Sequence, residues 1–364
     1  MMTALIVIAI LVLLIVVHEL GHFIAAKLSG VKVEEFGIGY PPRAVTLGTW
    51  GGTEYTLNWI PFGGFVRLFG DERDTQHGRG SFTDAPRWKQ AIILFAGVAM
   101  NAVAAWALFA IAFHVGILQP IKSVVPGEQA HVIVADVVPA SPASAAGMRP
   151  GDELVDISDA RGDRIIDALT PDSIIAFVRD HAGEPLEISY TSSGVEKRST
   201  IIPAQGVLGG EAGQPALGIA LVLAANRSEG WGLAMQDAFY QTIASFRDVA
   251  LSLWGLLGGV VEGKPDLSQV VGPVGIVSFV GAASQNGVGA VLMLAALISV
   301  NLVIINLLPI PALDGGRLVV LGFEVLTRKR APRLAMRLFN ALGISLIVVL
   351  MVVVTYQDIG RLFT

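Results

Sequence analysis

Four long apolar runs constrain what this chain can fold into. They cover residues 3–26, 91–118, 287–308 and 338–356. A helix needs about 20 apolar residues to cross the hydrocarbon core of a bilayer. Hydrophobic residues make up 53% of the 364 positions and charged residues only 15%, whereas a typical soluble domain has about 25% charged residues. The runs therefore predict a polytopic α-helical membrane protein with about four transmembrane helices.

Charge and cysteine content exclude several other classes of protein. The formal net charge of -5 gives no electrostatic basis for binding nucleic acid, so we expect no such partner. The chain has no cysteine, which excludes disulfides and thiolate metal sites.

The first apolar run has no basic residues before it and no small-residue cleavage site after it. We therefore expect it to be a membrane helix and not a cleaved signal peptide.

The first apolar run ends in the sequence VVHELGHFIAAK, residues 16–27. His18 and His22 are four residues apart, so both imidazoles lie on one face of a helix and can bind one zinc ion. Glu19 lies about 100° round the helix, as in the H-E-x-x-H motif, where the glutamate is the general base of a metalloprotease. The alternative is a chance spacing near a membrane surface. Ionisable groups are costly in a membrane, which favours the functional interpretation.

A third zinc ligand is needed, because catalytic zinc sites usually have three protein ligands and one open position. None of the other histidines is well placed, so a carboxylate is the better candidate. The sequence NLLPIPALDGGR, residues 306–317, follows the third apolar run and contains Asp314 in a glycine-bounded turn. Pro309 and Pro311 end the preceding helix. The alternative for Asp314 is a turn or capping aspartate without a metal.

Basic residues near the ends of the apolar runs predict the orientation in the membrane. They gather in the two connections that follow the first and third runs. The first connection has Lys27, Lys32, Arg43, Arg67, Arg73, Arg79, Arg87 and Lys89, and the second has Arg317, Arg328, Lys329, Arg330, Arg333 and Arg337. We therefore expect both connections to be cytoplasmic and both termini to be extracytoplasmic. This places His18, His22 and Asp314 together near the cytoplasmic side.

The pattern divides the chain into four parts. Residues 1–118 hold the first two membrane helices and, at 55–68, a segment centred on Pro-Phe-Gly-Gly that predicts a membrane-associated β-hairpin. Residues 119–225 are polar with short alternating runs, which predicts an extracytoplasmic α+β domain. Residues 226–285 predict an interfacial amphipathic helix, at about 230–262, and a linker. Residues 286–364 hold the last two membrane helices.

Together, the two motifs resemble those of the site-2 protease family of intramembrane zinc metalloproteases, in particular its RseP-type branch. The matching positions are Asn306, Pro309, Pro311, Leu313, Asp314 and Gly315, together with the H-E-x-x-H residues. Further similarity lies at residues 61–66, at Gly97 with Asn101, and at residues 272–276. The resemblance implies Zn²⁺ as cofactor, Asp314 as the third ligand and Glu19 as the catalytic base.

The same resemblance implies where substrate binds. Its candidate substrate-binding residues are Asn306, Pro311, Asn101, Gly63, Gly64 and Phe65. The segment around 55–68 resembles an element that pairs with an unwound substrate, and strand addition would expose a bond that a helix hides. Asn306 is expected to hold the substrate strand or the oxyanion. Alternatively, Asn101 and Asn306 could serve only as hydrogen-bonding groups between helices.

The polar part of the chain contains a second resemblance. The sequence SPASAAGMRPGD, residues 141–152, is similar to a signature of PDZ domains in bacterial proteases. Only one such signature is present, whereas the best-known RseP-type enzymes have two. A PDZ domain could bind a peptide C-terminus, could exclude substrates with bulky external domains, or could be a structural lid without a ligand.

These features predict an intramembrane zinc endopeptidase in the inner membrane of a bacterium. The resemblance implies single-span membrane proteins as substrates, such as anti-sigma factors already cut by a site-1 protease, and remnant signal peptides as a second class. One alternative is a non-catalytic membrane scaffold with a PDZ module, which would be expected to lack a metal-binding or base residue. Another is a transporter, which would be expected to show internal repeats.

Overall fold

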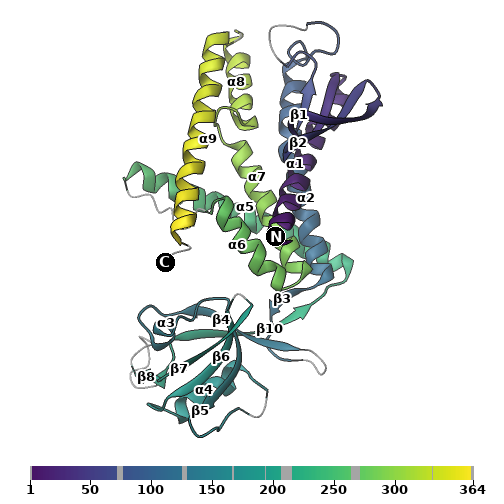
Figure 1. Ribbon diagram of the computed structural model, residues 1–364. Coiled ribbons are helices and arrows are strands. Elements are labelled where there is room, and N and C mark those ends of the chain that lie inside the picture. Colours follow the sequence, from purple (N-terminus) through teal and green to yellow (C-terminus); the bar gives the residue numbers. More distant parts are fainter. Residues whose placement is uncertain are drawn as a thin grey trace. The chain divides into compact units, whose positions relative to one another are not determined.

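A computed structural model describes residues 2–71, 77–124, 129–165, 168–192, 194–205, 215–263, 271–329 and 331–361 (Figure 1). The basic residues Arg73 and Arg330, used above for the orientation, lie outside these ranges. The chain forms two compact units. The first comprises residues 1–114, 230–284 and 291–364, and the second comprises residues 115–229 and 285–290. Each unit is described by itself.

The first unit is built mainly from long helices. They are α1 (Met2–Ser29), α2 (Arg87–Val115), α5 (Trp231–Val261), α6 (Pro273–Gln285), α7 (Val288–Leu307), α8 (Asp314–Thr327) and α9 (Arg333–Arg361). Within the described residues, four of them, α1, α2, α7 and α9, are long and apolar enough to cross a membrane. This agrees with the four predicted spans and with a membrane protein. The amphipathic segment predicted at 230–262 is helix α5, and its place at the membrane interface stays a prediction.

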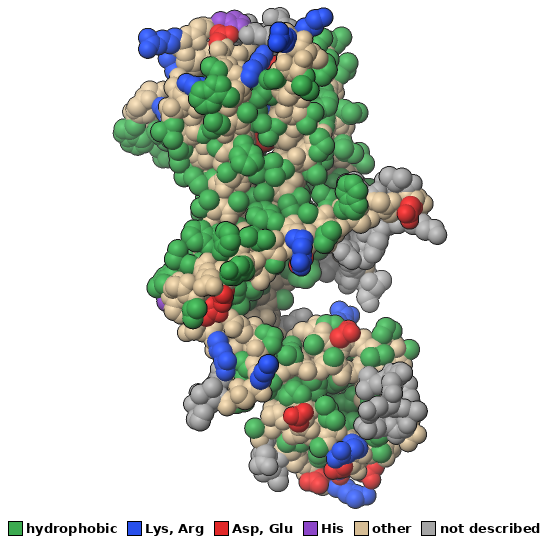
Figure 2. Space-filling view, turned by 180° about the vertical axis from the view of Figure 1, so that it is seen from behind, with side chains coloured by type: hydrophobic (Ala, Val, Ile, Leu, Met, Phe, Trp, Pro, Cys, Tyr) green, Lys and Arg blue, Asp and Glu red, His purple; other side chains and the backbone are tan. Residues whose placement is uncertain are grey.

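The exposed surface of the helical unit suits an apolar solvent. Hydrophobic side chains cover its middle, whereas Lys and Arg gather at the end that holds the connection from α8 to α9 (Figure 2). The start of α1 and the end of α9 both lie toward the opposite end (Figure 1). Helix α9 is also apolar and exposed, since only 11% of its most apolar 18-residue stretch is buried by the rest of the protein. A helix that is apolar all round and so little buried fits contact with lipid.

Two long strands, β1 (Val33–Trp50) and β2 (Thr53–Leu68), form a small sheet next to α1. They join at Gly51 and Gly52, both with positive φ, which glycine adopts readily. The pair folds back on itself, so the segment 35–38 registers both with residues 64–67 and with residues 54–57. Residues 54–57 run parallel to 35–38 and residues 64–67 run antiparallel to it, so the chain also reverses between these two stretches, where Pro-Phe-Gly-Gly lies. The predicted reversal is present, but it is not a hairpin, because its two arms pair with residues 35–38 between them and not with each other. Gly64 to Leu68 form an outer segment of the sheet.

A buried apolar cluster holds this sheet against the helices. It joins the C-terminal end of α1, the start of β1, the end of β2 and the first half of α2. Its buried members include Ala26, Val33, Leu68, Ile93 and Leu321. Burial of such side chains contributes about 25 cal/mol for each Å² of apolar surface removed from solvent. The cluster therefore fixes the end of α1, which carries His18 and His22, beside β2 and α2.

The second unit is a six-stranded sheet in the order β3-β10-β4-β5-β6-β7. Its strands are β3 (Ile117–Pro120), β4 (Ala130–Val137), β5 (Glu153–Asp159), β6 (Leu186–Ser192), β7 (Val195–Ile201) and β10 (Ile219–Arg227). Strands β8 (Ala204–Gln205) and β9 (Pro215–Ala216) form a separate pair. Helices α3 (Pro142–Ala145) and α4 (Pro171–Asp180) complete the unit. It has its own apolar core, centred on Val134, Ile157, Ile174 and Ile188.

Candidate metal centre and active site

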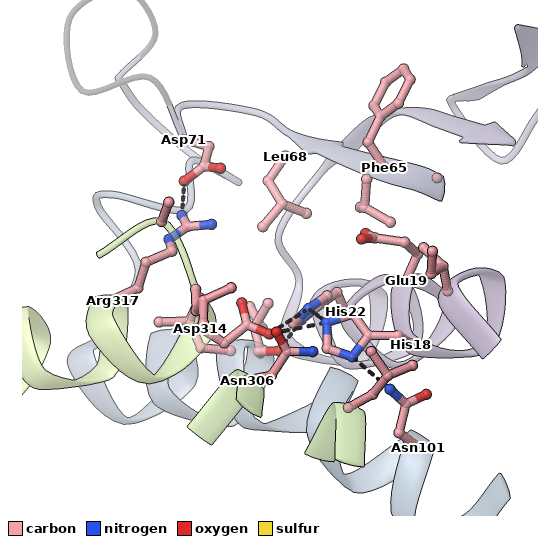
Figure 3. Close-up of a pocket in the computed structure, with 18 of the residues that line it drawn as sticks. His18, Glu19, His22, Phe65, Leu68, Asp71, Asn101, Asn306, Asp314 and Arg317 are labelled. Atoms are coloured by element: carbon pink, nitrogen blue, oxygen red, sulfur yellow. Dashed lines mark hydrogen bonds and ion pairs between the residues drawn. The ribbon is translucent and has the colours of Figure 1, made fainter. Parts of the chain in front are cut away.

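The sequence motifs 296 residues apart meet at one point in the helical unit (Figure 3). His18 and His22 lie one turn apart on α1, and their Nε2 atoms are 3.1 Å from each other. Oδ2 of Asp314, at the start of α8, lies 3.0 Å from Nε2 of His18 and 3.3 Å from Nε2 of His22. The predicted convergence of these three side chains is therefore present.

The spacing of these three atoms suits a zinc ion. Ligand atoms about 2.0–2.2 Å from a tetrahedral zinc lie about 3.3–3.6 Å from one another. The observed separations of 3.0–3.3 Å are close to this triangle. All three side chains are about nine-tenths buried, at 11–12% exposure. Two neutral imidazoles and one carboxylate are a common ligand set for catalytic zinc.

Local sequence explains how Asp314 reaches the histidines. Pro309 and Pro311 prevent α7 from continuing, and the chain turns before α8 begins at Asp314. Gly315 and Gly316 permit a close turn: a Cβ atom at either position would lie within 2.4 Å of a backbone oxygen of the preceding segment. Burial opposes ionisation of Asp314, but the two adjacent imidazoles outweigh it and hold the pKa of Asp314 below its usual range.

A cavity of about 400 Å³ opens beside the three side chains. Glu19 lines it, and its carboxylate points into the space (Figure 3). Val66, in the outer segment of β2, lines the same cavity. The cavity therefore brings an acid–base group, a candidate metal site and a strand edge together. A cavity of this size can hold several residues of an extended peptide.

The structure brings most of the predicted site residues to this cavity. The lining includes His18, Glu19, His22, Gly64, Phe65, Asn101, Asn306 and Asp314. Two predicted substrate-binding residues do not line it. Gly63 faces the Tyr40 ring, and Pro311 is buried where Gly343 of α9 approaches its backbone. Each is followed directly by a residue that lines the cavity, Gly64 after Gly63 and Ala312 after Pro311.

The motif search missed some residues that line the cavity. Tyr40 of β1 borders it, and burial raises the pKa of its hydroxyl. Arg317, one turn after Asp314, forms an ion pair with Asp71, which follows β2 (Figure 3). Arg317 was visible in the sequence as the last residue of the second motif. Its partner was not, because nothing local in the sequence pairs position 317 with position 71.

A second group of potential metal ligands lies in the sheet unit. Donor atoms of Asp159, His181 and Glu184 come within 4.8 Å of one another. Their hydrogen bonds favour a structural role, since one Asp159 oxygen accepts from the backbone N–H groups of Arg161 and Asp163. Glu184 also lies 3.7 Å from the Arg161 guanidinium. The cluster in the helical unit is therefore the better candidate for a catalytic metal.

Comparison with known proteins decides the family. The model of peptidase family M50 matches residues 6–350, which covers nearly the whole chain. The chain belongs to peptidase family M50. This confirms the resemblance to site-2 proteases, and it supports a peptidase over the transporter and the non-catalytic scaffold.

Curated relatives of this M50 peptidase match it from end to end. A protein of Clostridium perfringens named as a zinc metalloprotease is 34% identical over 347 residues, which are 95% of each chain. One of Clostridium acetobutylicum with a similar name is 33% identical over 360 residues, or 97% of each chain. Zinc metalloprotease RasP of Geobacillus kaustophilus is 26% identical and covers 96% of each chain.

Proposed function

We propose that this M50 peptidase is an intramembrane zinc endopeptidase, with zinc held by His18, His22 and Asp314. The observation that carries the proposal is the convergence of two imidazole nitrogens and one carboxylate oxygen within 3.0–3.3 Å. A zinc ion there would act as a Lewis acid on a peptide carbonyl and on water. The names of the relatives also support zinc as the cofactor.

Glu19 is the proposed general base. It follows His18 directly, so it lies near the ligand face of α1 while its carboxylate remains free to line the cavity. It would take a proton from the attacking water and pass it to the leaving amine. Asn306, at the other side of the cavity, is proposed to donate a hydrogen bond to the developing oxyanion.

The outer segment of β2 is the proposed binding strand for substrate. Residues 64–68 pair with β1 on one side. Among the described residues, no strand pairs with them on their other side. A transmembrane substrate is helical, so its scissile bond lies inside its own hydrogen-bond ladder. Pairing with Gly64 and Phe65 would hold an unwound stretch extended beside Glu19.

The test uses matched variants of the full-length protein purified in detergent. Wild type should contain about one zinc per chain and cleave a single-span substrate. Glu19→Gln should retain zinc and lose cleavage, because only the base is removed. Asp314→Ala should lose or weaken zinc binding. Cleavage that persists in Glu19→Gln would refute the assigned base, and full zinc binding in Asp314→Ala would refute the assigned ligand.

We propose single-span membrane proteins as the substrate class, such as anti-sigma factors already trimmed by a site-1 protease, or remnant signal peptides. The proposal rests on the family and on a site within helices that fit a bilayer. The proposed location is a bacterial inner membrane, with the site near the cytoplasmic side and both termini extracytoplasmic. Cysteine labelling of single-cysteine variants near Asp71 and near Thr3 would test this orientation, since the native chain has no cysteine.

We propose the sheet unit to be an extracytoplasmic PDZ domain. Ser141 caps α3 by accepting from the Ser144 backbone N–H, and Gly147 and Gly151 both have positive φ. Asp152 accepts a hydrogen bond from the Arg149 backbone. The signature residues thus serve the turn between β4 and β5, which is a reason for their fixed spacing.

The edge of β10 beside α4 is the proposed peptide groove. Strand β3 pairs with residues 224–227 of β10, and the Leu223 oxygen accepts from the Ile121 backbone N–H, whereas β4 pairs with residues 219–225. Among the described strands, none pairs with residues 219–222 on the β3 side, and α4 contacts β10. Leu221→Glu should weaken binding of a peptide with an apolar C-terminus, measured by fluorescence anisotropy on the full-length protein. Unchanged binding would argue for a size filter or a lid.

A further inference from the structure

One face of α2 packs directly against the two histidines. Gly97 and Asn101 lie one turn apart on this face. A Cβ atom at Gly97 would lie 2.4 Å from Nε2 of His22 and 2.8 Å from Cε1 of His18. Asn101 is completely buried, and its backbone oxygen accepts a hydrogen bond from Ser299 of α7. Position 97 therefore makes room for the rings, and position 101 is held firmly beside them.

The two histidines differ in the partner of their Nδ1 atom. Nδ1 of His22 lies 2.7 Å from the backbone oxygen of Ile93. A carbonyl oxygen only accepts, so Nδ1 of His22 carries the proton and its Nε2 has a free lone pair. Nδ1 of His18 lies 3.3 Å from the Asn101 side-chain amide, while Oδ1 of Asn101 is buried without a hydrogen-bond partner.

The amide of Asn101 has two orientations of nearly equal shape. An asparagine oxygen and nitrogen are assigned only from their hydrogen bonds. If the amide turns by 180°, Oδ1 meets Nδ1 of His18, and the NH₂ group takes the position of Oδ1. His18 then donates through Nδ1–H, as His22 does to Ile93. Both imidazoles consequently present Nε2 lone pairs toward Asp314 (Figure 3).

We propose that Asn101 is a positioning residue whose side-chain oxygen accepts from Nδ1–H of His18 and so sets the tautomer in which His18 holds the metal. This rests on the proposed function, and it assigns Asn101 to the metal centre, not to the substrate. Hydrogen bonds to the second nitrogen of a ligating histidine fix the ring and raise its basicity, and their loss costs about 10- to 100-fold in metal affinity or activity.

The experiment measures zinc affinity by chelator competition on full-length protein in detergent. Asn101→Leu has a similar volume but no acceptor, and should bind zinc about 10- to 100-fold more weakly. Asn101→Asp restores an acceptor, and should bind zinc within a few-fold of wild type. The matched control is Asn301→Leu, because Asn301 is exposed on α7 and its side chain donates to the Leu297 backbone oxygen of the same helix. It should bind zinc as wild type does.

A spectroscopic readout separates positioning from folding. Cobalt(II) bound in place of zinc has visible absorption bands that depend on ligand geometry. Asn101→Asp should keep the wild-type bands, and Asn101→Leu should shift or broaden them. If Asn101→Leu does not yield folded protein, Asn101→Ala takes its place, since it also lacks an acceptor.

The outcomes are distinct. Unchanged zinc affinity and cobalt bands in Asn101→Leu would overturn the proposal. So would an equal loss of zinc in Asn101→Asp and Asn101→Leu, because the acceptor would then not matter. If wild type itself binds no zinc, or Asp314→Ala binds as wild type does, the proposed function fails, and this result is independent of any change at Asn101.

Discussion

The histidine side and the aspartate side of the candidate metal centre are held in different ways. His18 and His22 rest on α2 through buried, uncharged contacts at Ile93, Gly97 and Asn101. Asp314 differs, because its Oδ2 is buried without a hydrogen-bond partner among the described residues, and Leu313 before it makes no side-chain cap hydrogen bond. Helix α8 is held further along by ion pairs. We infer that the histidine half, formed by α1 and α2, holds the two imidazole rings rigidly. The position of the aspartate half, formed by α8, depends on ion pairs.

The ion pairs of α8 lie on one face of that helix. Arg317 pairs with Asp71, and Glu324 lies 2.9 Å from Arg87 at the start of α2. Arg317 also packs over the ring of Phe82. Both members of the first pair remain partly exposed, at 38% and 29%, whereas the Glu324 side chain is almost fully buried at 1%. Breaking the two ion pairs of α8 is therefore expected to lower activity by different amounts.

The largest effect is expected at Gly97. In Gly97→Ala, the new methyl group would meet both histidine rings at 2.4–2.8 Å, and the backbone of α2 cannot easily retreat. Activity should fall at least about 100-fold, because a small misplacement of catalytic groups has effects of this size. The control is Gly322→Ala on α8, where nothing lies within 4 Å. Equal activity of both variants would contradict a rigid histidine half.

A moderate effect is expected when the Arg317–Asp71 pair is broken. Arg317→Gln and Asp71→Asn should each lower activity about tenfold, since contacting pairs have coupling energies of about 0.5–3 kcal/mol. The double variant should be no worse than either single variant, because each removes the same interaction. Strictly multiplied losses in the double variant would show that the two residues act separately.

A smaller effect on activity is expected from Arg87→Gln, which removes the partner of a buried carboxylate. Glu324 retains a hydrogen bond from the Ala331 backbone N–H. The loss of a hydrogen bond to a charged group should lower the free energy of unfolding by about 2 kcal/mol. Thermal unfolding in detergent should show a lower Tm, with activity reduced only a few-fold. An unchanged Tm would mean that this pair does not hold α8.

The smallest effect is expected at Lys27, which donates to the exposed Gly51 oxygen from the end of α1. Lys27→Gln removes a charge from the histidine-bearing helix without touching the buried contacts. Activity should stay within about twofold of wild type, since exposed polar interactions contribute about 0–1 kcal/mol. A large loss would show that the histidine half also depends on surface charge.

The convergence of His18, His22 and Asp314 could be predicted because each of the two motifs is a local sequence pattern. The spacing of His18 and His22 fixes a shared helix face, and the prolines before Asp314 mark the end of a helix. Basic residues predicted that both motifs lie on the same side of the membrane. The packing of the helices in the first unit then brings the two motifs together. The four apolar helices were equally visible, since each is longer than the ordinary helices of soluble domains.

The path of β1 and β2 could not be predicted in the same way. The alternation around Pro61 and Gly63 predicted a hairpin, whereas the two arms of this reversal are separated by residues 35–38, and a further reversal lies at Gly51 and Gly52. The segment 35–38 registers with two different stretches of β2, and such long-range pairing leaves no local pattern. The contact between Asn101 and His18 was missed for a related reason. A buried asparagine has the same sequence signature whether it meets a substrate, a helix or a histidine.

The distance along the chain between His18 and Asp314 also has a consequence for biosynthesis. Under the proposed ligand assignment, a nascent polypeptide acquires both histidines and Glu19 with its first helix, but it lacks the third ligand until α8 is translated. Two imidazoles alone bind zinc more weakly than a complete set. The hydrolytic centre is thus assembled only late in synthesis, after nearly all membrane helices exist. A ribosome-stalled fragment would carry the H-E-x-x-H motif without the means to use it.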